Sequence, residues 1–111
     1  GHHPVFSGGH HGNTPALVAR LKPLLERYKV QVYLNGHDHD MQHIAIDGVH
    51  YLTSGSGSKT RPTGKIDGTL FVASELGFLR ARLTAEAMEI GFVDSTGTVL
   101  YWASIPKSPG G

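Results

Sequence analysis

The stretch Val30-Gln31-Val32-Tyr33-Leu34-Asn35-Gly36-His37-Asp38-His39 decides the fold of this chain. Its first part predicts a buried strand over 30–34, and the polar residues that follow predict a turn over 35–40. In open α/β sheets, ligands gather beyond the carboxyl ends of the strands. Two imidazoles in this turn therefore indicate a ligand or metal site at the end of the strand.

A helix is predicted before this strand. Asn13 or Thr14 supplies the N-cap, and Pro15 suits the first helical position. Apolar residues with helical spacing follow, and they predict one face packed against a sheet. These residues are Leu17, Val18, Leu21, Leu24 and Leu25. Because Pro23 lies inside the pattern, a kink or two short helices are expected. Residues 1–40 are thus predicted to form a helix–strand unit with metal-ligand loops.

The sequence after residue 41 predicts mainly β-structure, so the fold class is α/β (α+β). Stretches 41–46 and 49–53 flank Asp47-Gly48, a dipeptide typical of a type I′ turn, and predict a hairpin. A Gly- and Ser-rich loop over 54–62 fits either a linker or a loop over an active site. Further strands are predicted at 69–74, 78–84, 87–93 and 98–105. We expect one domain over 1–111, with a β-rich half at 41–105 and a tail at 106–111.

Composition and charge exclude several classes of function. The chain has 111 residues and a formal net charge of +1, and its basic residues are scattered. This pattern is typical neither of a nucleic-acid footprint nor of a membrane-surface patch. No apolar run approaches the roughly 20 residues needed to span a bilayer. The chain lacks cysteine, which excludes disulfides and thiolate chemistry. The expected partners therefore include neither nucleic acid nor a membrane.

All eight histidines lie in the first 50 residues, at positions 2, 3, 10, 11, 37, 39, 43 and 50. Imidazole is the commonest metal ligand and the usual acid–base group near neutral pH. A donor set without sulfur fits Zn, Fe, Mn or Ni and disfavours a structural zinc finger. We predict His2, His37 and His39 as metal ligands, with surface or hydrogen-bonded histidines as the alternative. Asp38 or Asp40 could hold the second nitrogen of one of these rings.

The other histidines are interpreted from their places in the chain. His10 and His11 follow a Gly-rich turn, from which they can reach a substrate. His3 is expected to be structural. His43 and His50 fall on the predicted hairpin, where packed or surface histidines are expected.

The histidine motifs resemble those of a known family. Gly1-His2-His3-Pro4, His11-Gly12 and Gly36-His37-Asp38-His39 look like the carboxy-terminal motifs of the calcineurin-like metallophosphoesterases, in the purple (tartrate-resistant) acid phosphatase branch. The resemblance extends over nearly the whole chain. It implies the carboxy-terminal half of a four-layer α/β/β/α sandwich, and it suggests an extracytoplasmic location, secreted or periplasmic.

The resemblance also implies a chemistry and a role for each motif residue. The family holds two metal ions (Fe, Zn or Mn), and a metal-bound hydroxide attacks a phosphate ester. By motif position, His2 and His37 would ligate one metal and His39 the other. His11 matches a position that contacts phosphate and protonates the leaving group, so it is the expected catalytic residue. His10 stands where the family often has an acidic residue, and it is an expected substrate contact.

The earlier motifs of the family are not among these 111 residues. They are an Asp-x-His, a Gly-Asp with a nearby Tyr, and a Gly-Asn-His, and they supply the bridging Asp and an Asn ligand. Two alternatives stay open. The chain could supply the histidine ligands of a phosphatase that a missing N-terminal segment completes. It could instead be an inactive, self-assembling module that holds one Zn or Ni through three histidines, with a homo-oligomer partner covering its apolar sheet surface.

Overall fold

The computed structural model describes residues 1–107, so residues 108–111 of the tail predicted at 106–111 lie outside the described residues. Two short helices are followed by seven strands. The helices are α1 (Pro15–Arg20) and α2 (Lys22–Arg27), and the strands are β1 (Val32–Asn35), β2 (Met41–Ile46), β3 (Val49–Ser54), β4 (Thr69–Ala73), β5 (Gly77–Leu83), β6 (Ala87–Asp94) and β7 (Val99–Pro106). No helix within residues 1–107 has the length and apolar character needed to cross a membrane.

The proline inside the helical pattern explains why there are two helices. Leu21 ends α1 and serves as the N-cap of α2, and Pro23 then lies in the first turn of α2. A proline there removes no intrahelical hydrogen bond, whereas in the middle of one long helix it would. The prediction of two short helices is confirmed. The backbone N–H of Val30 still donates to the carbonyl of Leu25 (2.9 Å), so β1 begins at Val32 and not at residue 30.

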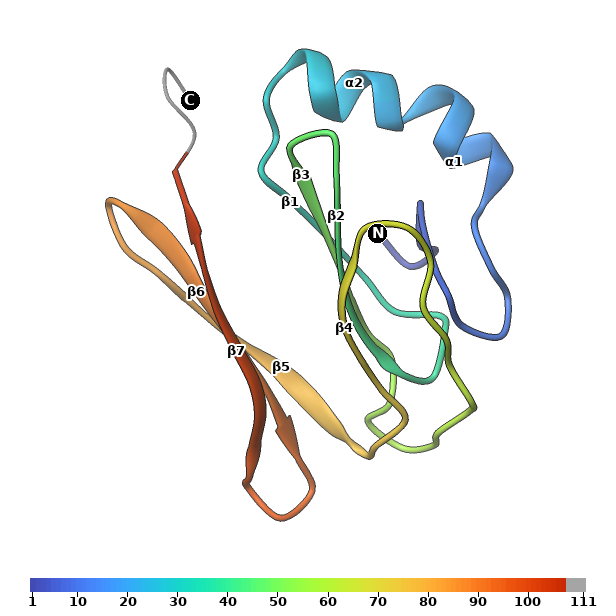
Figure 1. Cartoon of the computed structure of the whole chain (residues 1–111), viewed down its shortest axis with the longest axis vertical. Helices are drawn as coiled ribbons and strands as arrows, with labels where there is room; N and C mark the ends of the chain where they lie inside the picture. The colour runs from blue at the N-terminus through green and yellow to red at the C-terminus, as the bar shows by residue number, and fades with distance from the viewer. Residues whose placement is uncertain (108–111) are drawn as a thin grey trace.

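The strands form two sheets (Figure 1). The first has the order β1-β3-β2-β4, with β1 parallel to β3 and the other pairs antiparallel. The second is the antiparallel sheet β5-β6-β7. The predicted hairpin is β2–β3, and its turn residues Asp47 (φ 50°) and Gly48 (φ 82°) both have the positive φ that a type I′ turn requires. Pro106 ends β7, so the predicted tail begins one residue later than expected.

Alternating side chains of the first sheet explain how the layers stack. Tyr51 and Ile44 belong to a core that includes Leu25 of α2, whereas Leu52 belongs to a core with Ile90 of the second sheet. Successive residues of a strand point to opposite faces, so the first sheet is buried on both sides. The order helices, first sheet, second sheet is visible in Figure 1. The predicted α/β class and partial α/β sandwich are confirmed.

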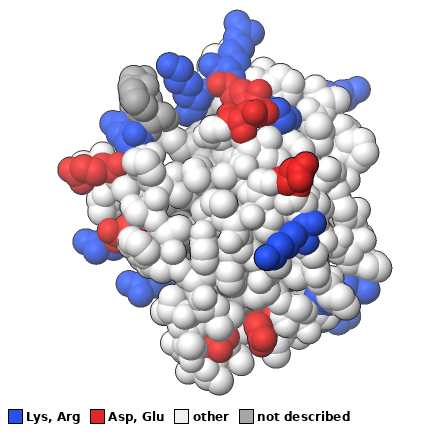
Figure 2. Space-filling model, viewed as in Figure 1, with Lys and Arg blue, Asp and Glu red and all other residues white. Residues whose placement is uncertain are grey.

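The outer face of the second sheet carries large exposed apolar side chains. Phe78 is 54% exposed, Val99 55% and Trp102 62%. In the view of Figure 2 the charged side chains lie mostly along the rim, several of them together at the top, and the centre is largely uncharged. Arg80, Arg82 and Glu89 lie on the same face. Exposed apolar side chains gathered on one face are typical of a surface that another chain or segment covers.

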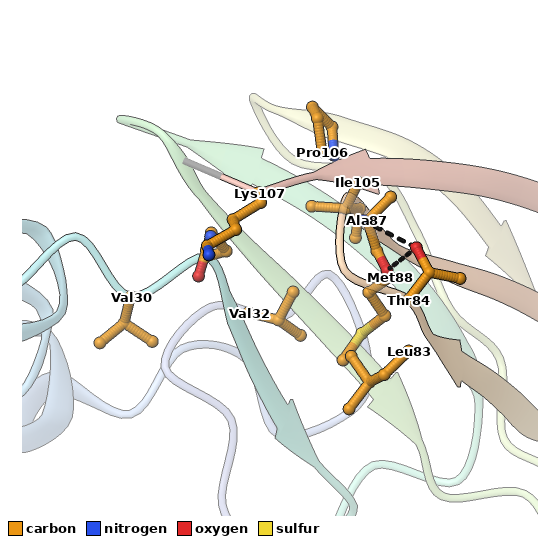
Figure 3. A pocket seen from close by; sticks show the side chains of 10 residues that line it. Val30, Val32, Leu83, Thr84, Ala87, Met88, Ile105, Pro106 and Lys107 are labelled. Atoms are coloured by element: carbon orange, nitrogen blue, oxygen red, sulfur yellow. Dashed lines mark hydrogen bonds between the residues drawn. The ribbon is translucent and has the colours of Figure 1, made fainter. Parts of the chain in front are cut away.

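A groove of about 320 Å³ lies beside β1, the edge strand of the first sheet. Figure 3 shows the inner side chains of the second sheet, among them Met88 and Ile105, extending past that edge toward Val30 and Val32. Leu83 also lines the groove and is 74% exposed. The inner face of the second sheet is therefore only partly covered by the first.

The exposed sheet face predicts self-association of the isolated chain. We expect a dimer or larger species in sedimentation velocity at about 100 μM, and Trp102→Lys is expected to weaken association at least about tenfold, because buried Trp residues are common hot spots. Thr96→Lys, in the exposed β6–β7 turn, is the matched control and should leave association unchanged. A wild-type chain that stays monomeric at this concentration would contradict the prediction.

Candidate metal centre

Two hydrogen bonds to backbone carbonyls bring the amino-terminal residues to the carboxyl end of β1, one from a backbone N–H and one from a side chain. The N–H of Gly36 donates to the carbonyl of His2 (3.0 Å), and the Tyr33 hydroxyl donates to the carbonyl of His3 (2.7 Å). The segment at 1–3 therefore runs beside the turn at 36–40. Residues more than 30 positions apart in the sequence meet at one end of the strand, as the strand-end position predicts.

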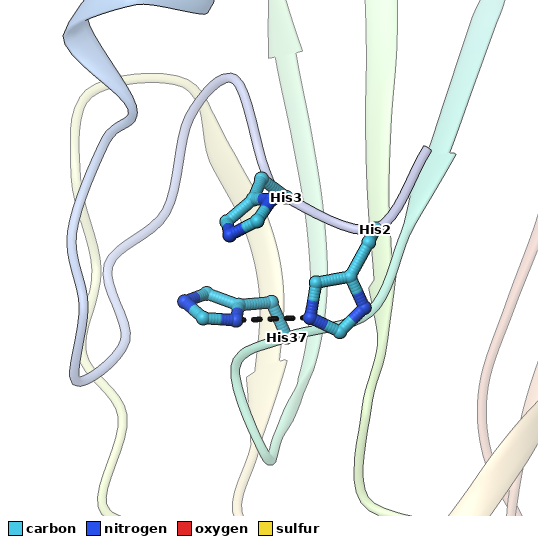
Figure 4. Close-up of side chains that lie close together, drawn as sticks. All are labelled: His2, His3 and His37. Carbon is cyan, nitrogen blue, oxygen red and sulfur yellow. Dashed lines mark hydrogen bonds between the residues drawn. The ribbon is translucent and has the colours of Figure 1, made fainter.

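Three imidazoles point toward one another there (Figure 4). One ring nitrogen from each of His2, His3 and His37 lies within 4.8 Å of the others, and His2 Nε2 is 3.1 Å from His37 Nδ1. His37 has a left-handed backbone (φ 68°), a conformation that costs a non-glycine residue about 1 kcal/mol. Burial lowers the pKa of His37, and the neighbouring His11, His3 and His2 lower it further. The neutral ring, which can coordinate a metal, is thereby favoured.

His39 is not part of this group of three among residues 1–107. Its Nδ1 is buried and has no hydrogen-bond partner within the described part of the chain. Buried polar atoms are nearly always paired, so this nitrogen fits a ligand atom for a metal. The separate placement of His37 and His39 is compatible with ligands of two metals, and that assignment stays a prediction.

Asp38 holds the ring of His11. The carboxylate is fully buried; its Oδ1 lies 2.5 Å from His11 Nδ1 and accepts a hydrogen bond from the backbone N–H of the same residue (3.0 Å). Burial pushes the pKa of Asp38 upward, but hydrogen bonds from Ser7 and His11 outweigh that effect and hold it below its usual value. The His11 side chain is 41% exposed, and its ring lies 4.0 Å from that of His37, centroid to centroid. Asp38 therefore engages Nδ1 of this ring, and Nε2 is the nitrogen that it does not engage.

A buried polar network supports the two site loops. Ser7 Oγ donates to Asp38 Oδ2, and Gln42 Nε2 donates both to Ser7 Oγ (2.9 Å) and to Asp40 Oδ1 (2.9 Å). The side-chain oxygen Oε1 of Gln42 accepts a hydrogen bond from the backbone N–H of Gly8 (2.9 Å). Burial raises the pKa of Asp40. These buried hydrogen bonds link the two loops and fix their relative position, although Asp40 Oδ2 has no hydrogen-bond partner within the described residues.

The Gly- and Ser-rich loop after β3 lies against the site. The N–H of Arg61 donates to the carbonyl of His39 (2.9 Å), and the N–H of Gly64 donates to that of Gly8 (3.0 Å). Of the two interpretations of this loop, a linker or a loop over an active site, the contacts support the second.

His10 is exposed, and its ring is 4.9 Å from that of His11, centroid to centroid.

His43 and His50 lie away from the metal centre. His43 is buried between the sheets, with Nδ1 2.9 Å from the Tyr101 hydroxyl and Nε2 2.8 Å from His50 Nδ1. Burial and the neighbouring His50 lower the pKa of His43 to about 4, and burial also lowers that of His50. These histidines pack, in agreement with their position on the hairpin.

Sequence reasoning missed two features of the site. His3 was expected to be structural, yet its ring lies 4.4 Å from that of His37, centroid to centroid. Asp38 or Asp40 was predicted as a possible partner of one metal-ligating ring, and the oxygens of Asp38 are engaged by Ser7 and His11. The adjacent histidines at 2 and 3 could have indicated that His3 also lies at the site. No local sequence pattern predicts the contact of Asp38 with His11, which is 27 positions away.

The nitrogen-rich set of donors fits the borderline transition metals that the family is expected to hold. The observations that support this fit are the close pair of His2 and His37 nitrogens and the unpartnered Nδ1 of His39 within the described residues. No carboxylate joins the group of three imidazoles in residues 1–107, so the bridging ligand expected from the resemblance is not supplied here.

Solved structures define the class of protein. GAP50, titled "the anchor in the inner membrane complex of Plasmodium", aligns with a TM-score of 0.93 and 28% identity, over 98% of this chain and 36% of that one. A predicted phosphoesterase from Streptococcus pneumoniae aligns with a TM-score of 0.56 and 14% identity, over 86% and 55% of the two chains, and shows the fold alone. The fold is therefore part of a metallophosphoesterase-type α/β sandwich.

Relatives with similar sequences include purple acid phosphatases and tartrate-resistant acid phosphatases. Purple acid phosphatase 7 of Arabidopsis thaliana is 38% identical over 113 residues, which cover 96% of this chain and 34% of the relative. Human tartrate-resistant acid phosphatase type 5 is 32% identical over 118 residues, covering 96% and 36%. No protein-family profile matches the chain. The predicted resemblance is confirmed: the chain is similar to purple acid phosphatases, and it spans about a third of the length of these relatives.

Proposed function

We propose that the protein hydrolyses phosphate esters at a dinuclear metal centre, to which this chain contributes His2, His37 and His39. The observation that carries the proposal is the 3.1 Å approach of His2 Nε2 to His37 Nδ1, beside a His11 ring held by a buried carboxylate. Metal ions bound there (Fe, Zn or Mn) would supply an activated water and offset the charge that develops on the phosphate.

His11 is the proposed general acid. Asp38 engages its Nδ1 and so directs Nε2 outward, toward the space where a leaving group would lie. Because Asp38 has a lowered pKa, it stays negative near neutral pH and keeps the His11 ring in place through Nδ1. The proton would pass from Nε2 to the leaving oxygen as the ester bond breaks. His10, exposed beside His11, is the proposed second substrate contact.

The relatives are longer than this chain, and we propose that a segment equivalent to their remaining residues is the partner of this chain. We propose that this segment covers the groove between β1 and the second sheet, where Val32, Leu83 and Ile105 lie open. A second copy of the chain is the alternative partner that could cover this groove.

By the same resemblance we propose an extracytoplasmic location, which fractionation of the source cells tests.

The test is hydrolysis of an aryl phosphate by the native protein with added Zn, Mn or Fe. His11→Ala is expected to lower kcat about a hundredfold, because a positioned general acid contributes about that factor or more. His10→Ala is expected to raise KM several-fold. Arg20→Gln, exposed on α1, is the control and should behave as the wild type. An inactive native protein that carries the family's earlier motifs would contradict the proposal.

A further inference from the structure

We propose that Ser7 and Gln42 are positioning residues for His11: they fix the direction of the hydrogen bonds that reach Asp38, and Asp38 in turn holds the His11 ring. Neither residue has a role among those that the family motifs imply. The inference rests on the proposed role of His11 as general acid, and it adds the residues that set the orientation of its ring.

Two backbone N–H groups fix the direction of the network, because an N–H can only donate. The N–H of Gly8 donates to Gln42 Oε1 (2.9 Å), so the orientation of the Gln42 amide is set and its Nε2 must donate on the other side. The N–H of Gly9 donates to Ser7 Oγ (3.0 Å). Gln42 is fully buried and Ser7 is 3% exposed, so these hydrogen bonds are shielded from solvent.

The Ser7 hydroxyl is left with one direction for its proton. Its oxygen accepts from the Gly9 N–H and from Gln42 Nε2 (2.9 Å). A hydroxyl has two acceptor lone pairs and one proton. Both lone pairs are therefore used, and the proton goes to the carboxylate that the hydroxyl contacts, at Asp38 Oδ2. Without the Gln42 donor, the hydroxyl could turn its proton away from Asp38.

Asp38 transmits this arrangement to His11. An ionised carboxylate only accepts hydrogen bonds. With Oδ2 held by Ser7, Oδ1 accepts the backbone N–H of His11 (3.0 Å) and lies 2.5 Å from Nδ1 of the same residue. The ring therefore carries a proton on Nδ1, and Nε2 is the nitrogen that can give a proton to a leaving group. Loss of the Ser7 hydroxyl would free the carboxylate to rotate, and the ring with it.

The first measurement is proton NMR of the full chain. We expect the Nδ1 proton of His11 to resonate far downfield, as in a short charge-assisted hydrogen bond. In Ser7→Ala this resonance is expected to move upfield or to be lost through exchange with water. The matched control is Ser56→Ala, because the Ser56 hydroxyl is equally buried (1% exposed) but has no hydrogen-bond partner among the described residues. It should leave the resonance unchanged.

The second measurement compares two substrates of the native protein. An alkyl phosphate releases an alkoxide, which must take up a proton as the P–O bond breaks, whereas dinitrophenolate leaves without one. Ser7→Ala is expected to lower kcat on the alkyl phosphate about tenfold, part of the hundredfold or more that a positioned general acid contributes, and to leave kcat on the dinitrophenyl phosphate nearly unchanged. Gln42→Met, which keeps the side-chain volume without the amide, should show the same pattern.

Two results would overturn the inference. One is an unchanged Nδ1 resonance in Ser7→Ala; the other is a kcat that falls no more on the alkyl phosphate than on the dinitrophenyl phosphate, as a merely structural role would give. Thermal unfolding of each variant confirms that it is folded. The proposed hydrolysis fails separately: a native protein that cleaves neither substrate leaves the NMR comparison to decide whether Ser7 positions His11.

Discussion

Acidification from pH 7 to pH 4 is expected to lower the free energy of unfolding of the chain by about 3 kcal/mol through His43 alone. This ring is 1% exposed and lies between the Tyr101 hydroxyl and His50, with its pKa lowered to about 4. In the unfolded chain the same ring takes up a proton near pH 6.5. Between these values the unfolded state binds more protons, so stability is complete above about pH 6.5 and falls as the pH drops toward 4.

Urea unfolding at several pH values measures this effect. His43→Gln removes this titration while leaving a polar group to face Tyr101, so its stability should fall by about 3 kcal/mol less than that of the wild type between pH 7 and 4. The lowered pKa of His50 is present in both proteins. The lowered pKa of Asp38 acts mainly below pH 3.8. The raised pKa of Asp40 opposes the trend, but it is present in both proteins and cancels in their difference. Equal slopes for wild type and variant would contradict the prediction.

Gly55→Ala is expected to lower the free energy of unfolding by about 3 kcal/mol, the upper end for overpacking. A Cβ at this position would lie 1.9 Å from the carbonyl oxygen of Asp38 and 2.9 Å from its carbonyl carbon. Both are backbone atoms of the histidine turn, so no side chain can rotate away. The N–H of Gly55 also donates to the carbonyl of Asp40 (3.1 Å), which holds the two segments together.

Gly57→Ala is the matched control for this substitution. A Cβ at Gly57 meets no atom within 4 Å, so the change is expected to stabilise slightly, by about 0.4–1 kcal/mol, through the unfolded state. Thermal and urea unfolding of the two variants measure the difference. If Gly55→Ala were as stable as Gly57→Ala, the close approach of the turn to this loop would be wrong.

The secondary structure could be predicted from local patterns. Asp47-Gly48 set the hairpin turn, and Pro23 divided the helical region, because each limits the backbone angles of its own residues. Strand bounds differ from the predictions by one or two residues, as at β1, where Val30 still bonds to Leu25. The pairing of β1 with β3 in parallel was beyond these patterns, since it joins segments that no short turn connects.

The sequence by itself determined the chemistry available to this protein: imidazoles without thiols, gathered at the end of one strand, in motifs that resemble a metallophosphoesterase. Only the tertiary structure decided which groups meet. In the folded chain the ring of His3 lies beside that of His37, and Asp38 contacts Nδ1 of His11. The physical reason is that ring-to-ring and carboxylate-to-ring contacts depend on where two loops cross, and that crossing is set by the sheet and the buried polar network.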